Sequence, residues 1–365
     1  METRETREKR EKWEDWLADA IAGCWSGARL SRIEAIRGDA SARRFWRVAI
    51  EDPARVAPHS AIAVDLGPDD LPAYVRALGL VADPPTEPPF VNVHRFLTEI
   101  GAAVPKLYAF SAANRMLLVE DVGTTALFDA AAEASAHDAA VLYRDAIDQL
   151  LVIHCEGTRR LDDGCIAAHI AYDSRLFRWE LEQFIEIGMP MVAPEADVAQ
   201  IVPELDRLAD SLGALPRVLS HRDYHGHNLF VQNGAIRVID FQDALLAPHA
   251  QDLAVLLTTR DTTRVITPAI EERLLNYYIG GLSRYIGGIS QRSESTPSAD
   301  ALMTSYRMCV LQHALKVIGR FEWLEQQGRR GYLRHIPYAI ANARRMLRQM
   351  PEFPAIRRAL DGRAP

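Results

Sequence analysis

The stretch that decides the fold reads SHRDYHGHNL over residues 220–229 and, a few residues later, VIDFQD over residues 238–243. Between these blocks lie two short apolar runs and an Asn-Gly pair: 229–232, 236–239 and Asn233-Gly234. An Asn-Gly pair between two such runs is a strong signal for a tight β-hairpin. The sequence therefore predicts a polar loop, a hairpin, and an aspartate, Asp240, at the end of the second hairpin strand.

Three side chains in this stretch have the types and spacing that phosphoryl transfer requires. Such a site needs a carboxylate that orients an attacking hydroxyl and accepts its proton, and it needs oxygen ligands for magnesium. Asp223 and Asn228 are five residues apart, which is the separation of these two parts in a kinase catalytic loop. We expect Asp223 to be the catalytic carboxylate, with Asn228 and Asp240 holding Mg2+.

The composition is that of an ordinary globular protein. At 365 residues the chain is long enough for two domains, because single cores stop growing at roughly 250–300 residues. Apolar residues make up 48% and charged residues 25%, which is not the profile of a disordered or fibrous chain. A formal net charge of −7 disfavours nucleic acid and anionic membranes as partners.

Targeting and redox signals favour a cytoplasmic location. The first ten residues are densely charged, with no apolar segment of a secretory signal behind them. No stretch approaches the roughly 20 apolar residues of a membrane span. The four cysteines are scattered, which fits a reducing compartment better than a disulfide framework. We therefore expect a cytoplasmic protein without a membrane partner.

Hydrophobic periodicity predicts a strand-rich first part and a helical second part. Helical spacing appears over residues 11–25 and, after a proline-rich stretch, over 91–100. Five strands are predicted in the first part: Leu30–Ile36, Arg44–Ile50, Ala61–Leu66, Lys106–Phe110 and Met116–Glu120. From Thr125 onward the pattern is almost wholly helical apart from the hairpin, with an exposed loop rich in Gly, Ser and Pro over 287–298.

This order of elements predicts an α+β protein with two lobes. The seam lies near residues 120–124, where the strand pattern gives way to the helical one. We expect a small, strand-rich N-terminal lobe over residues 1–120 that binds nucleotide. We expect a larger, mostly helical C-terminal lobe over residues 121–365 that carries catalysis and substrate binding.

The motifs around Asp223 resemble those of the aminoglycoside phosphotransferase family. The resemblance rests on His221-Arg222-Asp223 through Asn228, on Ile239-Asp240-Phe241, and on Ala247-Pro248 followed by Asp252-Leu253-Ala254. It implies a protein-kinase-like bilobal fold with ATP as co-substrate, bound between the lobes. It also implies that His221 and Asp252 are structural supports of the catalytic loop.

Within that family, further segments resemble the bacterial anomeric kinases of N-acetylmuramate and N-acetylglucosamine. The matching segments are 38–45, 62–65, 117–123, 311–319 and 331–333, and together the matches span about residues 36–347. Kinases of this group phosphorylate the sugar at its anomeric hydroxyl during cell-wall recycling. The resemblance implies a small-molecule sugar substrate of the same class here.

Two segments are candidates for nucleotide binding. The turn Gly38-Asp39-Ala40-Ser41 lies between two predicted strands, where backbone N–H groups and the serine hydroxyl are placed to bind phosphate oxygens. Backbone groups at the seam, at Glu120 and Val122, are expected to bind adenine.

A usual element of kinases is missing from the third strand. Residues 61–67 contain no lysine, and the helix over 91–99 offers no evident glutamate partner, so the lysine–glutamate ion pair of kinases cannot be drawn. Either magnesium and the 38–41 turn hold the phosphates, or the chain is a non-catalytic pseudokinase. The intact aspartate and both metal ligands favour an active kinase.

The acceptor site is marked by charged residues of the helical part. The candidates are Arg175, Arg178 and Glu180 on one helix, Asp243 after the second hairpin strand and Asp240, and His313 and Lys316 on another helix. A lactyl carboxylate requires a cation, for which Arg175 or Lys316 is the expected residue, and Asp243 is expected to bind metal or a sugar hydroxyl. Glutamates at 180, 182 and 186 leave open a kinase of another small alcohol or of an aminoglycoside.

Overall fold

The structure is a computed structural model that describes residues 4–36, 43–67, 71–81, 87–287 and 297–361. The chain divides into two compact units: unit 1 with residues 1–70 and 104–123, and unit 2 with residues 71–103 and 124–365. This division differs from the expected one after residue 120, because the segment 71–103 belongs to unit 2. In that segment, Phe90 packs on Phe241 with ring centroids 4.9 Å apart.

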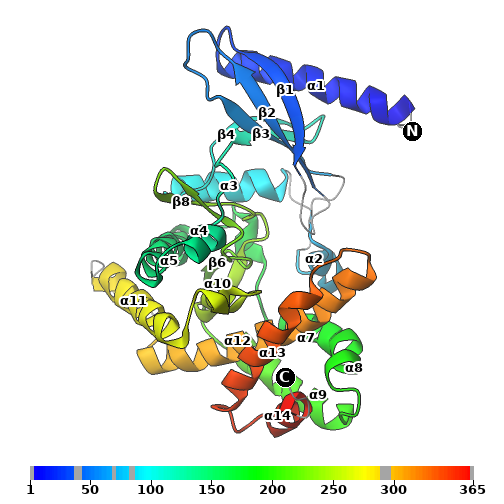
Figure 1. Cartoon of the computed structure of the whole chain (residues 1–365), viewed down its shortest axis with the longest axis vertical. Coiled ribbons are helices and arrows are strands. Elements are labelled where there is room, and N and C mark those ends of the chain that lie inside the picture. The colour runs from blue at the N-terminus through cyan, green and yellow to red at the C-terminus, as the bar shows by residue number, and fades with distance from the viewer. Residues whose placement is uncertain (1–3, 37–42, 68–70, 82–86, 288–296, 362–365) are drawn as a thin grey trace. The chain divides into compact units, whose positions relative to one another are not determined.

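Unit 1 is a five-stranded antiparallel sheet with a helix packed on it (Figure 1). The strands pair in the order β1-β2-β3-β5-β4, with bounds β1 Arg29–Ile36, β2 Arg44–Glu51, β3 Ser60–Asp65, β4 Leu107–Ser111 and β5 Met116–Glu120. Helix α1 (Arg4–Cys24) buries Trp13, Leu17 and Ile21 against apolar side chains of the strands. The five expected strands and the first helix are confirmed.

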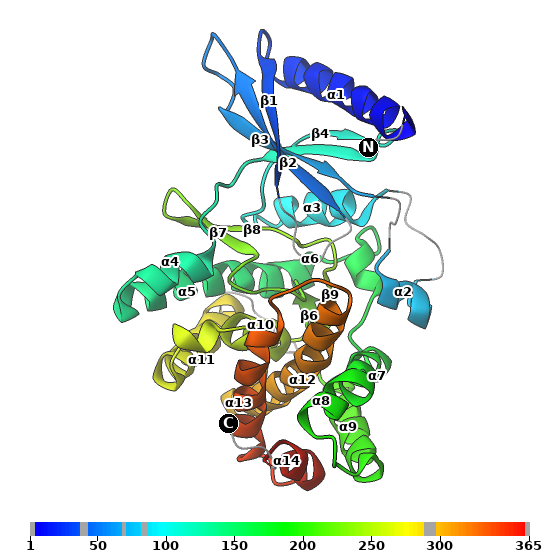
Figure 2. The ribbon, with the colours of Figure 1, turned by 45° about the vertical axis from the view of Figure 1, so that its right-hand side comes forward.

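Unit 2 is mostly helical (Figures 1 and 2). Its longer helices are α2 Ala73–Leu78, α3 Pro89–Glu99, α4 Leu127–Glu133, α5 Ala136–Leu151, α7 Ser174–Gln183, α9 Val198–Gly213, α10 Ala250–Thr258, α11 Pro268–Gly287, α12 Ala299–Gln326, α13 Ile336–Leu347 and α14 Pro354–Asp361. Helix α12 begins after Ser298, whose hydroxyl accepts a hydrogen bond from Ala301 N, as a good N-cap does. It packs against α13, α10 and α7.

Shorter helical segments complete unit 2. They are η1 Val152–Gly157, α6 Thr158–Arg160, η2 Ile166–His169, η3 Phe184–Gly188, α8 Met189–Val192, η4 Thr262–Arg264 and η5 Leu333–His335. Most of the expected loop between α11 and α12, residues 288–296, lies outside the described residues. Within the described ranges, no helix has both the length and the apolar character needed to cross a membrane.

Two pairs of short strands in unit 2 position the polar loop. β7 (Leu229–Gln232) and β8 (Ala235–Val238) form the expected hairpin, and Asn233 and Gly234 have φ of +50° and +77°, as a type I′ turn requires. β6 (Arg217–Ser220) and β9 (Leu245–Pro248) form a second pair, which the pattern did not predict in this otherwise mostly helical part. Strands of four residues are too short for periodicity to separate strand from helix.

Candidate active site

The loop over residues 221–228 connects β6 to β7, and its first turn is held by a buried aspartate on α10. The backbone N–H groups of His221 and Arg222 donate to the two carboxylate oxygens of Asp252, each over 2.8 Å. Arg222 has a φ of +76°, a left-handed conformation that is strained for a residue with a side chain. Asp252 therefore stabilises a strained turn immediately before Asp223.

Asp252 is itself fixed by a buried chain of hydrogen bonds. His154 Nε2 lies 3.1 Å from Asp252 Oδ2, and His154 Nδ1 lies 2.6 Å from the Tyr278 hydroxyl. That hydroxyl is also 2.8 Å from His249 Nδ1. Burial opposes ionisation of Asp252, but the hydrogen bonds from His154 and from the loop outweigh burial and lower the pKa of its carboxyl group. The result is an ionised anchor whose oxygens are already engaged.

The His221 ring links the loop to the hairpin. Its Nε2 lies 2.9 Å from the carbonyl oxygen of Ile239, and the ring packs edge to face on Tyr224, with centroids 5.4 Å apart. Tyr224 in turn donates its hydroxyl to the Ala146 carbonyl over 2.7 Å. These contacts join the His221 ring to the hairpin and to Tyr224, as a residue that supports the loop would.

The Arg222 side chain belongs to a second buried cluster. Its guanidinium lies 4.0 Å over the Tyr74 ring and 3.2 Å from Glu180 Oε1. Lys316 Nζ is 2.8 Å from the same oxygen. Burial opposes ionisation of Glu180, but the charges of Lys316 and Arg222 lower the pKa of its carboxyl group. Sequence reasoning did not find Tyr74, because it lies in a distant segment without a motif.

Asp223 is half-buried, and its carboxylate is ionised. Burial alone would raise the pKa of this group, but the positive charges of Arg222 and Lys316 outweigh burial and hold the pKa at about 2. Among the described residues, none donates a hydrogen bond to the Asp223 carboxylate. The group is thus charged while its lone pairs remain available, which is what a base for a substrate hydroxyl requires.

Asn228 and Asp240 lie next to each other. Asn228 Nδ2 donates to the Asp223 carbonyl over 3.0 Å and is 3.4 Å from Asp240 Oδ2. β8 ends at Val238, so Asp240 lies just beyond the strand, with a φ of +63°. Carboxylate and amide oxygens are donors suited to Mg2+, which usually takes one or two carboxylates and completes its shell with phosphates and water. The pair fits a magnesium ion that also binds phosphate.

Unit 1 contains a charged network at the end of β5. Arg47 on β2 donates to the Asp121 carboxylate through Nε over 2.6 Å and through Nη2 over 3.1 Å, and Ser60 Oγ donates to it over 2.7 Å. Asp121 Oδ1 also accepts from Gly123 N over 3.0 Å, at a φ of +90° for the glycine. The network fixes the backbone around Val122, one of the two predicted adenine contacts.

Of the other nucleotide candidates, Glu120 is described by the structure. It ends β5, and its carboxylate accepts a hydrogen bond from Lys106 N over 3.0 Å. The turn Gly38-Asp39-Ala40-Ser41 lies outside the described residues. β3 ends at Asp65, which pairs with Arg44 over 2.6 Å, so this strand carries an acidic side chain and no lysine.

Three of the acceptor candidates, Lys316, Asp243 and Arg175, have different surroundings. Lys316 belongs to the buried cluster, and Asp243 Oδ2 is 3.9 Å from Arg222 Nη1. Arg175 is exposed, and its Nε pairs over 2.9 Å with Asp173, the N-cap of its own helix. The structure therefore brings Lys316 and Asp243 together around Arg222, whereas the contacts of Arg175 are local.

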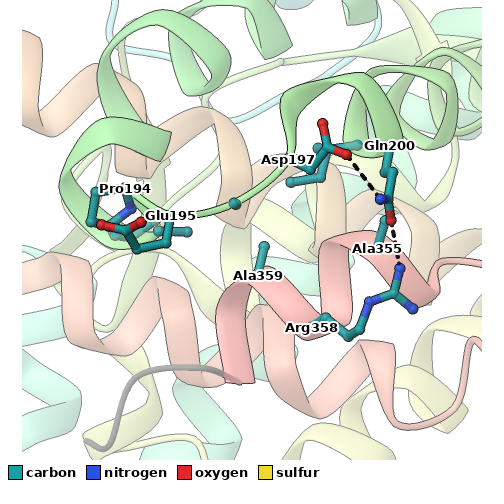
Figure 3. A pocket seen from close by; sticks show the side chains of 11 residues that line it. Pro194, Glu195, Asp197, Gln200, Ala355, Arg358 and Ala359 are labelled. Atoms are coloured by element: carbon teal, nitrogen blue, oxygen red, sulfur yellow. Dashed lines mark hydrogen bonds between the residues drawn. The ribbon is translucent and has the colours of Figure 1, made fainter.

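A pocket elsewhere in unit 2 lies between the start of α9 and α14 (Figure 3). Three of its polar side chains contact one another, since Gln200 donates to Asp197 over 2.9 Å and accepts from Arg358 over 3.0 Å. None of the candidate catalytic, metal or acceptor residues lines this pocket. It is a recess between packed helices that lies apart from these candidates.

Comparison with known sequences identifies the family. The profile of the phosphotransferase enzyme family matches residues 32–287. The chain belongs to this family. An N-acetylmuramate/N-acetylglucosamine kinase from Caulobacter vibrioides is 32% identical over 266 residues, covering 68% of this phosphotransferase and 72% of that protein. A kinase of the same name from Pseudomonas putida is 27% identical over 343 residues, covering 90% and 87%.

Comparison with solved structures identifies the fold. A choline kinase from Cryptosporidium parvum gives a TM-score of 0.59 at 14% identity, covering 94% of this phosphotransferase and 96% of that chain. An ADP-bound aminoglycoside phosphotransferase gives 0.52 at 12% identity, covering 92% and 96%. The fold is protein-kinase-like, as the resemblance implied. The family and the fold together imply the use of ATP.

Proposed function

We propose that this phosphotransferase transfers the γ-phosphoryl group of ATP to the anomeric hydroxyl of N-acetylmuramate and of N-acetylglucosamine. The observation that carries the proposal is the Asp223 carboxylate, which is ionised and accepts no hydrogen bond from the described residues. The backbone carbonyl of Asp223 accepts a hydrogen bond from Asn228, whose amide also contacts Asp240. The choice of acceptor is supported by the relatives at 32% and 27% identity, which are kinases of these two sugars.

In the proposed reaction, Asp223 orients the sugar hydroxyl and accepts its proton while the oxygen attacks the γ-phosphorus in line. Arg222 and Lys316 keep this base ionised at neutral pH. Asn228 and Asp240 would hold Mg2+, which supplies charge neutralisation on the phosphates when bound. Asp252 maintains the turn that aims Asp223 and is a positioning residue, since its oxygens are engaged by the loop and by His154.

For the nucleotide, we assign adenine binding to the backbone at Glu120 and Val122, and phosphate binding to the turn over residues 38–41. The Arg47–Asp121 network supports the first assignment, because it fixes the backbone around Val122. We place the enzyme in the cytoplasm, where ATP is available and where the four cysteines, all free, stay reduced.

For the sugar, we assign Lys316 and Asp243 to the acceptor site. Both contact the cluster around Arg222, the neighbour of the catalytic base. Asp243 carries a carboxylate suited to accept hydrogen bonds from sugar hydroxyls. Arg175 is the weaker candidate, because its guanidinium is exposed and already pairs with Asp173.

The test is ADP release from MgATP with four acceptors: N-acetylmuramate, N-acetylglucosamine, kanamycin and choline. We expect turnover with the two amino sugars and none with their 1-O-methyl glycosides, in which the anomeric oxygen is blocked. Turnover with kanamycin or choline alone would instead assign a kinase of an aminoglycoside or of another small alcohol. Nucleotide binding without ADP release for any acceptor would mean a non-catalytic scaffold.

A further inference from the structure

Helix α12 presents a row of side chains toward the cluster at Glu180. Gln312, Lys316 and Arg320 are spaced by four residues, so they share one face of the helix. Gln312 Nε2 donates to Glu180 Oε2 over 3.1 Å, and Lys316 Nζ pairs with Glu180 Oε1 over 2.8 Å. Arg320 is the next position of this row, one helical turn beyond the residues that contact Glu180.

Glu180 has no capacity left for another cation. Its Oε2 accepts hydrogen bonds from Tyr172 and Gln312, and its Oε1 is shared by Arg222 and Lys316. The carboxylate is 3% exposed. Glu180 is therefore not available as a partner for the charge of Arg320.

Arg320 has no acidic partner among the described residues. Its guanidinium lies 4.4 Å over the ring of Trp323, and no ion pair or hydrogen bond to a described residue accompanies this stacking. The side chain is half-buried, and its nitrogen atoms remain accessible to solvent. Stacking on an indole leaves the edge of a guanidinium, with its N–H groups, open to a ligand.

The surroundings of Arg320 favour an anion. Burial lowers the pKa of its guanidinium, and the positive charges of Arg222 and Arg329 lower it further, while Asp223 and Glu180 act in the opposite direction. Arg320 follows Lys316 by one helical turn, Lys316 contacts Glu180, and Glu180 contacts Arg222, the neighbour of Asp223. Arg320 therefore lies in the same part of unit 2 as the proposed base. A partly buried cation without a partner is costly, and a bound anion removes that cost.

We propose that Arg320 binds the lactyl carboxylate of N-acetylmuramate, with Lys316 beside it in the same row. A guanidinium matches a carboxylate through two parallel N–H···O hydrogen bonds, which an ammonium group cannot form. N-acetylglucosamine has a hydroxyl where N-acetylmuramate carries the lactyl ether, so it makes no such contact. The inference rests on the proposed function and names the residue that distinguishes its two acceptors.

The two sugars provide an internal control for the experiment. Arg320→Gln should lower kcat/KM for N-acetylmuramate by about 10- to 100-fold, the range for a lost hydrogen bond between charged groups, and change kcat/KM for N-acetylglucosamine by less than about 2-fold. Arg320→Lys keeps the positive charge, so it should lower kcat/KM for N-acetylmuramate less than Arg320→Gln does. Arg264→Gln removes an arginine whose side chain is 63% exposed and pairs with Asp261, and it should change neither value.

Other outcomes would overturn the inference. An equal loss for both sugars would make Arg320 a structural residue, and an unchanged kcat/KM for N-acetylmuramate would place its carboxylate elsewhere. A selective loss in Arg175→Gln instead would assign the carboxylate to Arg175. Failure of the proposed function is distinct, because wild-type protein would then release no ADP with either sugar. Equilibrium titration of N-acetylmuramate into the wild-type and Arg320→Gln proteins tests the contact without turnover, and equal affinity would refute it.

Discussion

Two carboxylates are associated with the same loop, Asp223 within it and Asp252 on α10, which binds its first turn, and they are ionised by different means. The anchor carboxylate, Asp252, is buried and accepts hydrogen bonds from His221 N, from Arg222 N and from His154. The proposed reactive carboxylate, Asp223, accepts none from the described residues, and its pKa is held at about 2, against the effect of burial, by the charges of Arg222 and other nearby groups.

The difference in hydrogen bonding suits the two carboxylates to different roles, Asp252 as a structural anchor and Asp223 as the proposed base. A hydrogen bond that stabilises a carboxylate also occupies its lone pairs and fixes its place, which suits an anchor. Charges at a distance stabilise the ionised form and leave the lone pairs unused, which suits a base that must accept a proton from a substrate. Arg222 serves both sides, because its N–H binds Asp252 and its guanidinium helps to ionise Asp223.

The largest effect is expected at the reactive carboxylate. Asp223→Asn preserves the shape of the side chain but removes the proton acceptor, so kcat should fall by about 10³- to 10⁴-fold, at the upper end of general-base contributions. ATP binding should remain measurable, because this side chain holds no nucleotide in the proposal. Turnover is measured as ADP release with N-acetylglucosamine, and ATP binding by titration. A kcat within a few fold of the wild-type value would remove Asp223 from its proposed role.

Substitution of the anchor carboxylate should mainly lower the stability of the fold, whereas substitution of Asp223 should mainly lower kcat. Asp252→Asn puts an amide where two backbone N–H groups and His154 need an acceptor, so the free energy of unfolding should fall by about 3 kcal/mol. Urea unfolding followed by circular dichroism measures this change. Asp210→Asn, at an exposed position of α9, is the matched control and should change stability by less than about 0.5 kcal/mol. Equal stability of the two variants would contradict the anchor role.

The sequence was sufficient for the parts of the site that are close together along the chain. The hairpin at Asn233-Gly234 was predicted from its turn chemistry, and it brings Asp240 to within 3.4 Å of Asn228. The spacing of Asp223 and Asn228 is a local property of one loop, so their chemistry could be proposed before the fold was known. The five strands of unit 1 followed from their apolar patterns.

The rest of the site depends on contacts between distant segments, which periodicity does not encode. Tyr74 stacks on Arg222, and Arg47 pairs with Asp121, yet neither pair has a spacing that a motif could capture. Arg320 was missed for a related reason: along the sequence it is one of several arginines near the end of α12. Its stacking on Trp323, without an acidic partner among the described residues, is a property of the folded chain.

A smaller effect is expected beside the reactive carboxylate, at the proposed metal ligand. Asp240→Asn keeps one oxygen but removes the negative charge, so the Mg2+ concentration for half-maximal activity should rise by at least about 10-fold, a change typical of weakened metal sites. The Asp210→Asn control should leave this concentration unchanged, and chelation of Mg2+ should abolish activity in all variants. An unaltered requirement for Mg2+ in Asp240→Asn would exclude Asp240 as a ligand.

The smallest effect is expected in the pH dependence of stability, which tests whether the charge of the anchor carboxylate stabilises the fold. The stabilisation from Asp252 should change by about 1 kcal/mol per pH unit. Its pKa is lowered in the folded protein, so the ionised form stabilises the fold above the unfolded-state pKa of about 3.9, and this stabilisation is lost as the pH falls through the folded value. The difference in unfolding free energy between wild type and Asp252→Asn should therefore narrow as the pH falls below about 4.5. The histidines His225 and His313, whose pKa values burial lowers to about 3 and about 4, also weaken the fold below about pH 6.5. They do so in both proteins, and their effect cancels in the difference. Urea midpoints at half-unit pH intervals measure the slope, and a difference that stays constant with pH would show that Asp252 gains no stabilisation from its charge.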